Sequence, residues 1–463
     1  MEPAAPGSAG ATVAALRRSF DDGLTRPLEW RRQQLRALER MLAEGEDELI
    51  EAMHADMGKP PVEARLTDLA LVASEVVYML RHMERWARPR RAGVPMAQQP
   101  AQAKVVHEPL GVALVIAPWN YPVQLLLAPM AAAICAGNCV VGKPSELTAR
   151  TSAATARLVR RYLDPRAVAI VEGGAEETQL LLAERFDTIF YTGNGRVGRI
   201  VMEAAARHLT PVTLELGGTS PAIVDADSDV SVAARRITWG KFLNAGQTCV
   251  APDYVLVHRD VENDFVDALA AMVRSFYGDD PRRSVDYARI VNDRHFERLS
   301  GLLASTSARV ALGGESDPAE RYIAPTVLTG VADDDPVMEE EIFGPILPVL
   351  AVDDVEDAVA AVNARPRPLA LYVFSSSKET VDRVIGSTTS GGVGVNCTVQ
   401  HVAVPTLPFG GVGPSGMGAY HGRQGFETFS HRRAVLAKPA HPDLPVQYPP
   451  YTKAKEWALK RFL

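Results

Sequence analysis

The spacing of hydrophobic residues changes along the chain and separates regions of different predicted structure. In residues 12–58 and 65–88, apolar side chains recur every three or four positions among many Arg and Glu residues. This spacing predicts amphipathic helices. The stretch at 88–102 is rich in Pro, Arg and Gln and interrupts the pattern. We expect it to leave the first domain as an extended arm.

From residue 111 onward, short apolar runs alternate with segments of helical spacing. Up to residue 218 these runs are GVALVIAP, NCVVGKPSE, AVAIVEGG, FDTIFYTG and PVTLELGG. Apolar runs that alternate with helical patterns predict right-handed βαβ units and therefore a parallel, doubly wound sheet. A second α/β region begins near Gly218 and continues to about residue 375. The Pro- and Gly-rich segment at 407–422 and a basic, aromatic tail follow it.

Composition indicates an ordinary globular protein and excludes several functional classes. The 463 residues are 47% hydrophobic and 23% charged, and a net charge of -7 gives no reason to expect nucleic acid as a partner. The N-terminus lacks the basic and apolar segments of a secretory signal. The longest apolar run, residues 123–137, is too short to span a membrane and contains Pro129. We therefore expect a cytoplasmic protein without a transmembrane segment.

Among the four cysteines, Cys249 has a local setting that suggests chemistry. It follows the small polar run Asn244–Thr248, which is typical of a turn with little bulk around the thiol. A buried structural cysteine and a nucleophile in an accessible loop both fit this setting. Cys135 and Cys139 lie in apolar sequence and are expected to pack in a core. No Cys/His cluster has metal-ligand spacing, so we expect neither a metal site nor a disulfide framework.

A glycine-rich sequence between a predicted strand and a predicted helix matches the GxGxxG pattern. Its glycines are Gly193, Gly195 and Gly198, and such a turn lets a pyrophosphate approach the backbone and the helix N-terminus. The pattern also expects an acidic residue at the end of the next strand, which makes Glu215 a candidate ribose ligand. If residues 111–118 form the first strand of the sheet, the acid is instead Glu146, beside Lys143. Glu215, between apolar segments, is then free to act as a partly desolvated base.

Six short motifs, considered together, resemble one enzyme family. They are PWNYP (118–122), GKPSE (142–146), TLELGG (213–218), GQTCVAP (246–252), EEIFGP (340–345) and PFGG (408–411). They follow the order of the NAD(P)-dependent aldehyde dehydrogenase superfamily. Residues 186–218, WGKFLNAGQTCVAPDY and GMGAYHGRQGFETFSHRR are similar to its class 3 branch, which acts on medium-chain and aromatic aldehydes. The resemblance covers nearly the whole chain.

The resemblance implies a covalent mechanism with three catalytic residues. Cys249 is the implied nucleophile, because a thiol attacks an aldehyde readily and leaves readily from the resulting thioester. Asn120, with the backbone N–H of Cys249, is the implied donor to the oxyanion. Glu215 is the implied base that activates water against the thioester. The products are a carboxylic acid and reduced cofactor.

The resemblance also implies a cofactor site for NAD, with NADP as an alternative. Lys143 and Glu146 are expected at the adenosine ribose, the glycine-rich turn at the pyrophosphate, Glu341 at the nicotinamide ribose and Phe343 beside the nicotinamide ring. The full set expected to bind the cofactor is Trp119, Lys143, Glu146, Gly193, Asn194, Gly198, Leu216, Gly217, Glu341 and Phe343. Around the aldehyde entrance the resemblance places Tyr121, Trp239 and His421, whose rings favour an apolar substrate.

The expected fold is α/β, with two doubly wound Rossmann-like domains and a small β oligomerisation arm. We assign residues 1–90 and 108–217 to the NAD(P)-binding domain, 218–425 to the catalytic thiol domain, and 91–107 with 426–463 to the arm and tail. The class 3 resemblance implies a homodimer. The tail is basic and amphipathic, which favours a surface helix or partner contact over docking on a membrane surface. Two residues depart from the family pattern: Asn194, where many relatives have Ser, and Thr219, where Lys is common.

Three other functions compete with this interpretation. An acylating dehydrogenase passes its thioester to coenzyme A and has no need of Glu215 as a base. A cysteine hydrolase requires a histidine beside Cys249, and only the fold can bring His401 or His421 there. A catalytically silent dinucleotide-binding protein has no use for Cys249, Glu215 and Asn120 together.

Overall fold

The structure is a computed structural model that describes residues 9–443 and 445–462. Residues 1–8, which hold much of the segment used above to exclude a secretory signal, lie outside the described residues. The predicted N-terminal helices form α1 (Ala9–Asp21), α2 (Leu28–Glu44), α3 (Glu46–Met57) and α5 (Ala70–Ala87). Between α3 and α5 lie the short helix α4 (Pro61–Ala64) and the π-helical turn η1 (Arg65–Leu69).

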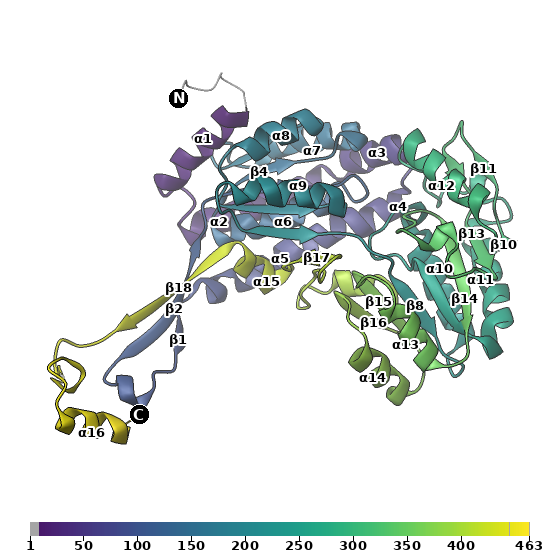
Figure 1. Ribbon diagram of the computed structural model, residues 1–463. Helices are drawn as coiled ribbons and strands as arrows, with labels where there is room; N and C mark the ends of the chain where they lie inside the picture. Colours follow the sequence, from purple (N-terminus) through teal and green to yellow (C-terminus); the bar gives the residue numbers. More distant parts are fainter. Residues whose placement is uncertain (1–8, 444, 463) are drawn as a thin grey trace.

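The first sheet confirms the predicted βαβ pattern. Its parallel strands are β3 (Val112–Ile116), β4 (Cys139–Lys143), β5 (Val168–Ile170), β6 (Thr188–Thr192) and β7 (Val212–Glu215), in the order β7-β6-β3-β4-β5. The crossovers are α6 (Gln124–Ala136), α7 (Ala149–Tyr162), α8 (Ala175–Ala183) and α9 (Gly195–Ala206). Every residue of β3, β4 and β6 is buried, because helices enclose the sheet (Figure 1). Burial on both faces explains why these strands are continuously apolar in sequence.

The second sheet has the order β10-β13-β14-β9-β8-β15-β16. Its strands are β8 (Pro221–Val224), β9 (Tyr254–His258), β10 (Arg309–Leu312), β13 (Thr326–Thr329), β14 (Ile346–Val352), β15 (Ala370–Phe374) and β16 (Gly392–Val395). They pair in parallel except for β10, which is antiparallel to β13 at one edge. The associated helices are α10 (Val230–Phe242), α11 (Glu262–Tyr277), α12 (Asp293–Ser305), α13 (Val355–Asn363) and α14 (Lys378–Ser387).

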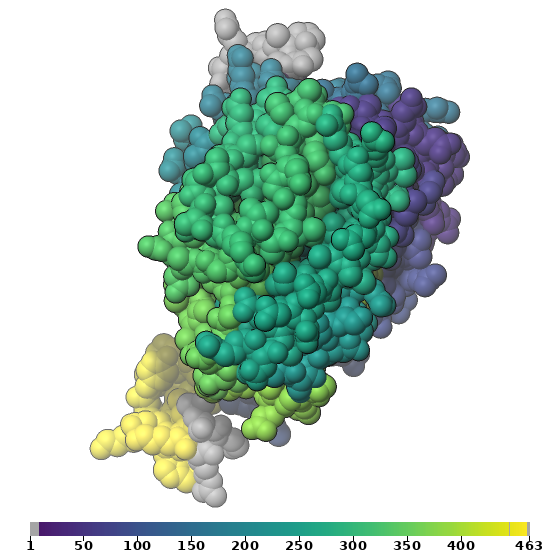
Figure 2. All heavy atoms as spheres, turned by 90° about the vertical axis from the view of Figure 1, so that its right-hand side faces the viewer, coloured from purple at the N-terminus to yellow at the C-terminus, as the bar shows by residue number. Residues whose placement is uncertain are grey.

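An antiparallel sheet extends from the body of the molecule. It consists of β1 (Arg90–Ala92), β2 (Gln102–Pro109) and β18 (Ser430–Ala437), with β2 in the middle. Helix α16 (Lys453–Phe462) lies at its far end (Figure 1). In Figure 2, where atoms of the second α/β region face the viewer in teal and green, the C-terminal segment, in yellow, projects beyond the body.

After the second sheet the chain returns to the first. Strand β17 (Gly416–Met417) pairs antiparallel with β7, and α15 (Gly422–Thr428) packs against α5 and α6. The domain boundary expected at residue 425 therefore falls inside α15, whereas the one expected at 218 lies in the loop between β7 and β8. Within the described residues, none of the helices is both long and apolar enough to cross a membrane.

Candidate active site

A cavity of about 1030 Å³ lies between the two large sheets. One wall is formed by loops that follow the carboxyl ends of β3, β4, β6 and β7. The opposite wall includes the Cys249 loop and the loop between β13 and β14. In the first sheet the strand order reverses between β3 and β6, and ligands of such sheets bind outside the carboxyl ends of the strands at this point. The cavity is therefore where the topology predicts a ligand site.

The loop that carries Cys249 is tightly wound. Helix α10 ends at Phe242, and Asn244 and Ala245 both adopt φ values of 52°. At Gly246 (φ 76°) an added Cβ would lie 2.2 Å from the carbonyl oxygen of Gly344, so this turn requires glycine. Cys249 itself is half-buried and lines the cavity. Burial, together with the nearby carboxylates of Glu341 and Glu215, raises the pKa of its thiol to about 12.

Glu215 is the last residue of β7, and its side chain is buried in the cavity wall. It is 2% exposed, and neither carboxylate oxygen has a hydrogen-bond partner among the described residues. Burial raises the pKa of this carboxyl well above its ordinary value. A buried carboxyl group without partners needs a functional explanation. It is placed to act on a ligand or a water molecule in the cavity.

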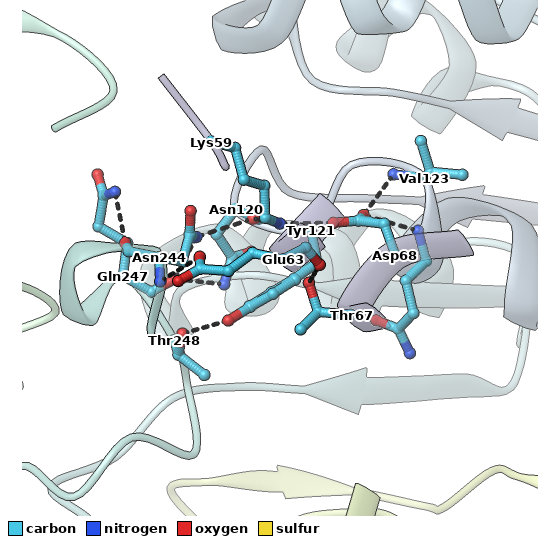
Figure 3. Close-up of polar contacts among 11 residues, drawn as sticks. Lys59, Glu63, Thr67, Asp68, Asn120, Tyr121, Val123, Asn244, Gln247 and Thr248 are labelled. Atoms are coloured by element: carbon cyan, nitrogen blue, oxygen red, sulfur yellow. Dashed lines mark hydrogen bonds and ion pairs between the residues drawn. The ribbon is translucent and has the colours of Figure 1, made fainter. Parts of the chain in front are cut away.

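Asn120 and Tyr121 follow β3 and contact the Cys249 loop (Figure 3). The Asn120 side chain is buried, and its Nδ2 donates a 3.0 Å hydrogen bond to the carbonyl oxygen of Gln247. An amide nitrogen carries two N–H groups, so one remains to face a ligand. The hydroxyls of Tyr121 and Thr248 lie 2.6 Å apart. The structure thus brings Cys249, Glu215 and Asn120, the three residues that the resemblance implies as catalytic, to one cavity.

The residues expected at the adenosine end of a cofactor surround one end of this cavity. Lys143 ends β4 and is 2% exposed; its Nζ donates to the carbonyl of Pro144 (2.7 Å) and lies 4.0 Å from Glu146. The Glu146 side chain is 53% exposed, so it is accessible to a ligand. Asn194 caps α9 by accepting the N–H of Val197 (3.0 Å). Gly193 lines the cavity beside it, whereas Gly198 lies buried within α9.

The residues expected at the nicotinamide end come from both sheets. Phe343 has a φ of 47° and packs edge-to-face on Trp119, with ring centroids 5.5 Å apart. Burial, reinforced by Asp253, raises the pKa of Glu341 to about 8. A Cβ at Gly217 would lie 2.0 Å from a carboxylate oxygen of Glu341, so the missing side chain makes room for that carboxylate. Leu216, Gly217, Glu341 and Phe343 all line the cavity.

Of the three rings expected near the substrate, the structure places two in this cavity. Tyr121 is buried, and Trp239 is 36% exposed on α10. His421 instead lines a separate cavity of about 400 Å³ with Arg90, Arg423 and Arg432 among its neighbours. Its backbone φ of 80° turns the ring toward Phe409, on which it stacks at 5.4 Å, and toward Glu75. The prediction that His421 lies at the aldehyde entrance is therefore wrong.

The sequence profile described as the aldehyde dehydrogenase family matches residues 4–435. The chain belongs to the aldehyde dehydrogenase family. It is 48% identical over 427 residues to the rat "Aldehyde dehydrogenase, dimeric NADP-preferring", covering 92% of this chain and 94% of that protein. It is also 48% identical over 453 residues to rat "Aldehyde dehydrogenase family 3 member A2", covering 97% and 93%. The resemblance predicted from the six motifs is confirmed.

A solved structure agrees with this membership. "Substrate bound state of Staphylococcus Aureus AldH" superposes with a TM-score of 0.95 at 42% identity, covering 97% of this chain and 98% of that one. The aldehyde dehydrogenase has the predicted two-domain, Rossmann-like α/β fold. It is an NAD(P)-dependent oxidoreductase that oxidises aldehydes.

The cavity of this aldehyde dehydrogenase fits a dinucleotide. Its lining includes Glu146 and Asn194 from the first sheet's side, Glu341 and Phe343 from the loop between β13 and β14, and Cys249. The departures from the family pattern differ in their location. Asn194 lines the cavity and its amide NH₂ remains available, while Thr219 does not line it.

The described residues contain no group of three or more His, Cys, Asp or Glu side chains arranged to hold a metal ion.

Sequence reasoning missed several charged residues around the site. Lys241 is fully buried, lies 3.8 Å from Asp253 and, because of burial, has its pKa lowered to about 8. Arg298 lines the cavity and donates a 2.6 Å hydrogen bond to the carbonyl of Ile342. Lys59 and Asp68 form a buried ion pair behind Asn120. The sequence around these residues does not distinguish them from charged residues exposed to solvent. Only Lys59, which precedes two prolines, has an unusual local setting.

Proposed function

We propose that this aldehyde dehydrogenase oxidises medium- or long-chain aliphatic or aromatic aldehydes, with Cys249 as the nucleophile. One observation carries the proposal: Cys249, Asn120 and Glu215 line a single cavity that is also lined by several apolar side chains. These apolar side chains include Leu66, Leu71, Leu125, Trp239 and Val402. Leu66 is 57% exposed and Trp239 36%, so both are accessible from solvent. Apolar lining favours a hydrophobic aldehyde.

The first step we propose is addition of the Cys249 sulfur to the aldehyde carbon. The S–C bond forms, the thiol proton passes to water in the cavity, and the carbonyl oxygen gains negative charge. The unpaired N–H of the Asn120 amide and the Cys249 backbone N–H donate to this oxyanion. One such donor contributes roughly 3–4 kcal/mol to transition-state stabilisation.

NAD(P)⁺, when bound, supplies the hydride acceptor that converts the hemithioacetal into a thioester on Cys249. The residues proposed to hold it are Lys143 and Glu146 at the adenosine ribose, Asn194 and the α9 N-terminus at the pyrophosphate, and Glu341, Phe343, Trp119, Leu216 and Gly217 at the nicotinamide end. Glu215 then removes a proton from water, the oxygen adds to the thioester carbon, and the Cys249 sulfur leaves. Because burial raises the pKa of Glu215, its ionised form is a strong base.

We propose that NAD is used more efficiently than NADP and that both are accepted. A carboxylate at Glu146 accepts hydrogen bonds from ribose hydroxyls and repels a 2′-phosphate. The ammonium group of Lys143 lies 4.0 Å from that carboxylate. Its positive charge partly offsets the repulsion between Glu146 and the 2′-phosphate of NADP.

The arm and the tail support a homodimer as the functional assembly. Apolar side chains are exposed on them: Met96 is 84% exposed, Leu436 56% and Tyr451 69%. Contact with a second subunit would bury such surface.

The four cysteines are all free, which supports a reducing compartment such as the cytoplasm.

A single spectrophotometric assay tests the proposed reaction. Purified enzyme is mixed with NAD and decanal or benzaldehyde, with and without coenzyme A, and NADH is followed at 340 nm. We expect NADH and free acid in equal amounts, independent of coenzyme A. Dependence on coenzyme A would identify an acylating dehydrogenase, and ester hydrolysis without any NADH formation would identify a cysteine hydrolase. Analytical ultracentrifugation of the same preparation measures its molar mass and therefore tests whether the enzyme is a homodimer.

A further inference from the structure

Lys59 is fully buried behind the cavity wall, at 0% exposure. It lies between α3 and α4, directly after Gly58, which ends α3 with a φ of 63°, and directly before Pro60 and Pro61. A residue before proline is restricted to extended backbone conformations. The carbonyl of Lys59 also lies 3.2 Å from Nδ1 of His54. The backbone of Lys59 is therefore fixed independently of its side chain.

The ammonium group of Lys59 makes three contacts (Figure 3). Its Nζ donates to a carboxylate oxygen of Asp68 at 2.5 Å and to the backbone carbonyl of Asn120 at 3.2 Å. It also lies 3.9 Å from the centroid of the Tyr121 ring, a cation–π contact. An ammonium group has three N–H donors, so every donor has a partner. Two of these partners belong to the turn that carries the proposed oxyanion donor.

Asp68 holds the other end of the same turn. It lies in the π-helical turn η1, and its second carboxylate oxygen accepts the backbone N–H groups of Val123 and Gln124, each at 3.1 Å. These N–H groups lie at the start of α6, where helical donors lack partners. The Lys59–Asp68 pair thus clamps residues 120–124 from both sides.

The Cys249 loop contacts the same carbonyl. Nδ2 of Asn244 donates to the backbone oxygen of Asn120 at 3.0 Å and to the carbonyl of Gln247 at 3.2 Å. The carbonyl of Gln247 also accepts the side-chain amide of Asn120. Lys59 therefore contributes to a network that fixes both the backbone and the side chain of Asn120 relative to the loop of the nucleophile.

We propose that Lys59, paired with Asp68, is a positioning residue for the oxyanion site, an inference that rests on the proposed role of Asn120. A buried ion pair is a poor way to stabilise a fold, since its desolvation offsets most of the attraction. Its value here lies in geometry, because a misplacement of about 1 Å in an active site lowers rates by roughly 10²-fold. Lys59 touches neither the cavity nor the reacting atoms.

The test compares two reactions of Cys249 in the intact enzyme. Acylation by 4-nitrophenyl acetate forms an oxyanion, whereas alkylation by iodoacetamide forms none. Removing one oxyanion donor lowers rates by roughly 10²–10³-fold. We expect Lys59→Met to slow acylation and aldehyde oxidation by about 10- to 100-fold, with alkylation and NAD affinity changed by less than about twofold.

A double-mutant cycle with Asn120→Ala separates positioning from general damage. If Lys59 acts through Asn120, Lys59→Met slows acylation in the parent enzyme and has no further effect in Asn120→Ala. Equal losses in both backgrounds would overturn the inference. Arg31→Met is the matched control: Arg31 is a buried cation that donates to the carbonyls of Thr25 and Arg26 away from the cavity, and its effect should be the same with or without Asn120.

A second variant addresses folding. Lys59→Met leaves Asp68 as a buried carboxylate without its counter-ion, whereas Lys59→Met/Asp68→Asn removes both charges and keeps an acceptor for the α6 N–H groups. Slow acylation that persists in the double variant supports positioning by Lys59. Restored acylation would overturn it, because the defect then comes from the unpaired charge. If Asn120→Ala alone acylates normally, the proposed role of Asn120 fails; if it is slow while Lys59→Met is normal, only the role of Lys59 fails.

Discussion

The side-chain amide of Asn120 donates a 3.0 Å hydrogen bond to the backbone carbonyl of Gln247, two residues before Cys249. This bond joins the loop after β3 in the first sheet to the loop before β9 in the second. The position of the proposed oxyanion donor is therefore set together with that of the proposed nucleophile. The Tyr121–Thr248 hydroxyl contact at 2.6 Å reinforces the same junction.

Replacing Cys249 by Ala should abolish both aldehyde oxidation and ester hydrolysis, because no other group at the site can form the covalent intermediates. NAD affinity, measured by fluorescence titration, should stay within about twofold, since the cofactor residues are untouched. Cys397→Ala is the control: that thiol is also half-buried but does not line the cavity. Appreciable turnover by the Cys249 variant would remove this residue from the mechanism.

Cofactor choice should depend on Glu146. Glu146→Gln removes the charge that repels a 2′-phosphate, while Lys143 stays 4.0 Å away from this position. We expect the ratio of kcat/KM for NADP to that for NAD to rise by about tenfold, corresponding to roughly 1.4 kcal/mol. Glu203→Gln, an exposed position on α9, should leave the ratio unchanged. If the NADP-to-NAD ratio of kcat/KM does not change in Glu146→Gln, the adenosine ribose is bound elsewhere. The next candidate is then Glu215, the ribose ligand that the GxGxxG pattern predicts.

The buried Glu75 should make stability depend on pH. Burial raises its pKa from 4.5 to about 7, although its carboxylate accepts the N–H of Gly422 at 3.0 Å. The folded state therefore binds the proton more tightly than the unfolded state. The stability from this proton is complete below pH 4.5 and is lost as pH rises through about 7, a change of about 3 kcal/mol.

Glu75→Gln keeps an acceptor for Gly422 and removes the ionisation. Its melting temperature should exceed that of the parent at pH 8 and match it near pH 4.5. Thermal denaturation across this range measures the effect, and Glu51→Gln, at an exposed position on α3, should follow the parent at every pH. If the melting temperatures of Glu75→Gln and the parent change with pH in the same way, Glu75 does not couple protonation to folding.

The parts of the fold that were predictable from sequence depend on local patterns. Continuously apolar runs locate β3, β4 and β6 because these strands are buried on both faces. Since the strands are parallel, their carboxyl ends meet at one edge of the sheet. That geometry explains why Asn120, Lys143 and Glu215, each just after or at the end of an apolar run, come to one cavity.

The parts that were not predictable depend on contacts between distant residues. The ammonium of Lys59 meets the carbonyl of Asn120 across 61 positions of sequence, and no periodic pattern reports such a pair. His421 illustrates the same limit, because a left-handed backbone conformation and stacking on Phe409 turn its ring into another cavity. Side-chain direction outside regular strands and helices is set by the packed fold.

Glu215 is the residue for which the sequence allows two roles, a ribose ligand or a base. In the structure its side chain is buried in the cavity wall, and its oxygens have no partner among the described residues. Lys143 and Glu146, rather than Glu215, occupy the end of β4 expected at the ribose. These observations favour the base.

Replacing Glu215 by Gln distinguishes the two roles. A ribose ligand, when lost, raises the Michaelis constant for NAD and leaves turnover otherwise normal. A base, when lost, still permits hydride transfer, because that step requires no activated water. The thioester then accumulates on Cys249, and rapid mixing should show a burst of about one NADH per site, followed by a steady-state rate lower by roughly 10²–10⁴-fold. A burst that is itself slowed would show that Glu215 also deprotonates the thiol, and raising the pH should restore it because hydroxide can then remove the Cys249 proton. Normal turnover with weak NAD binding would eliminate Glu215 as the base.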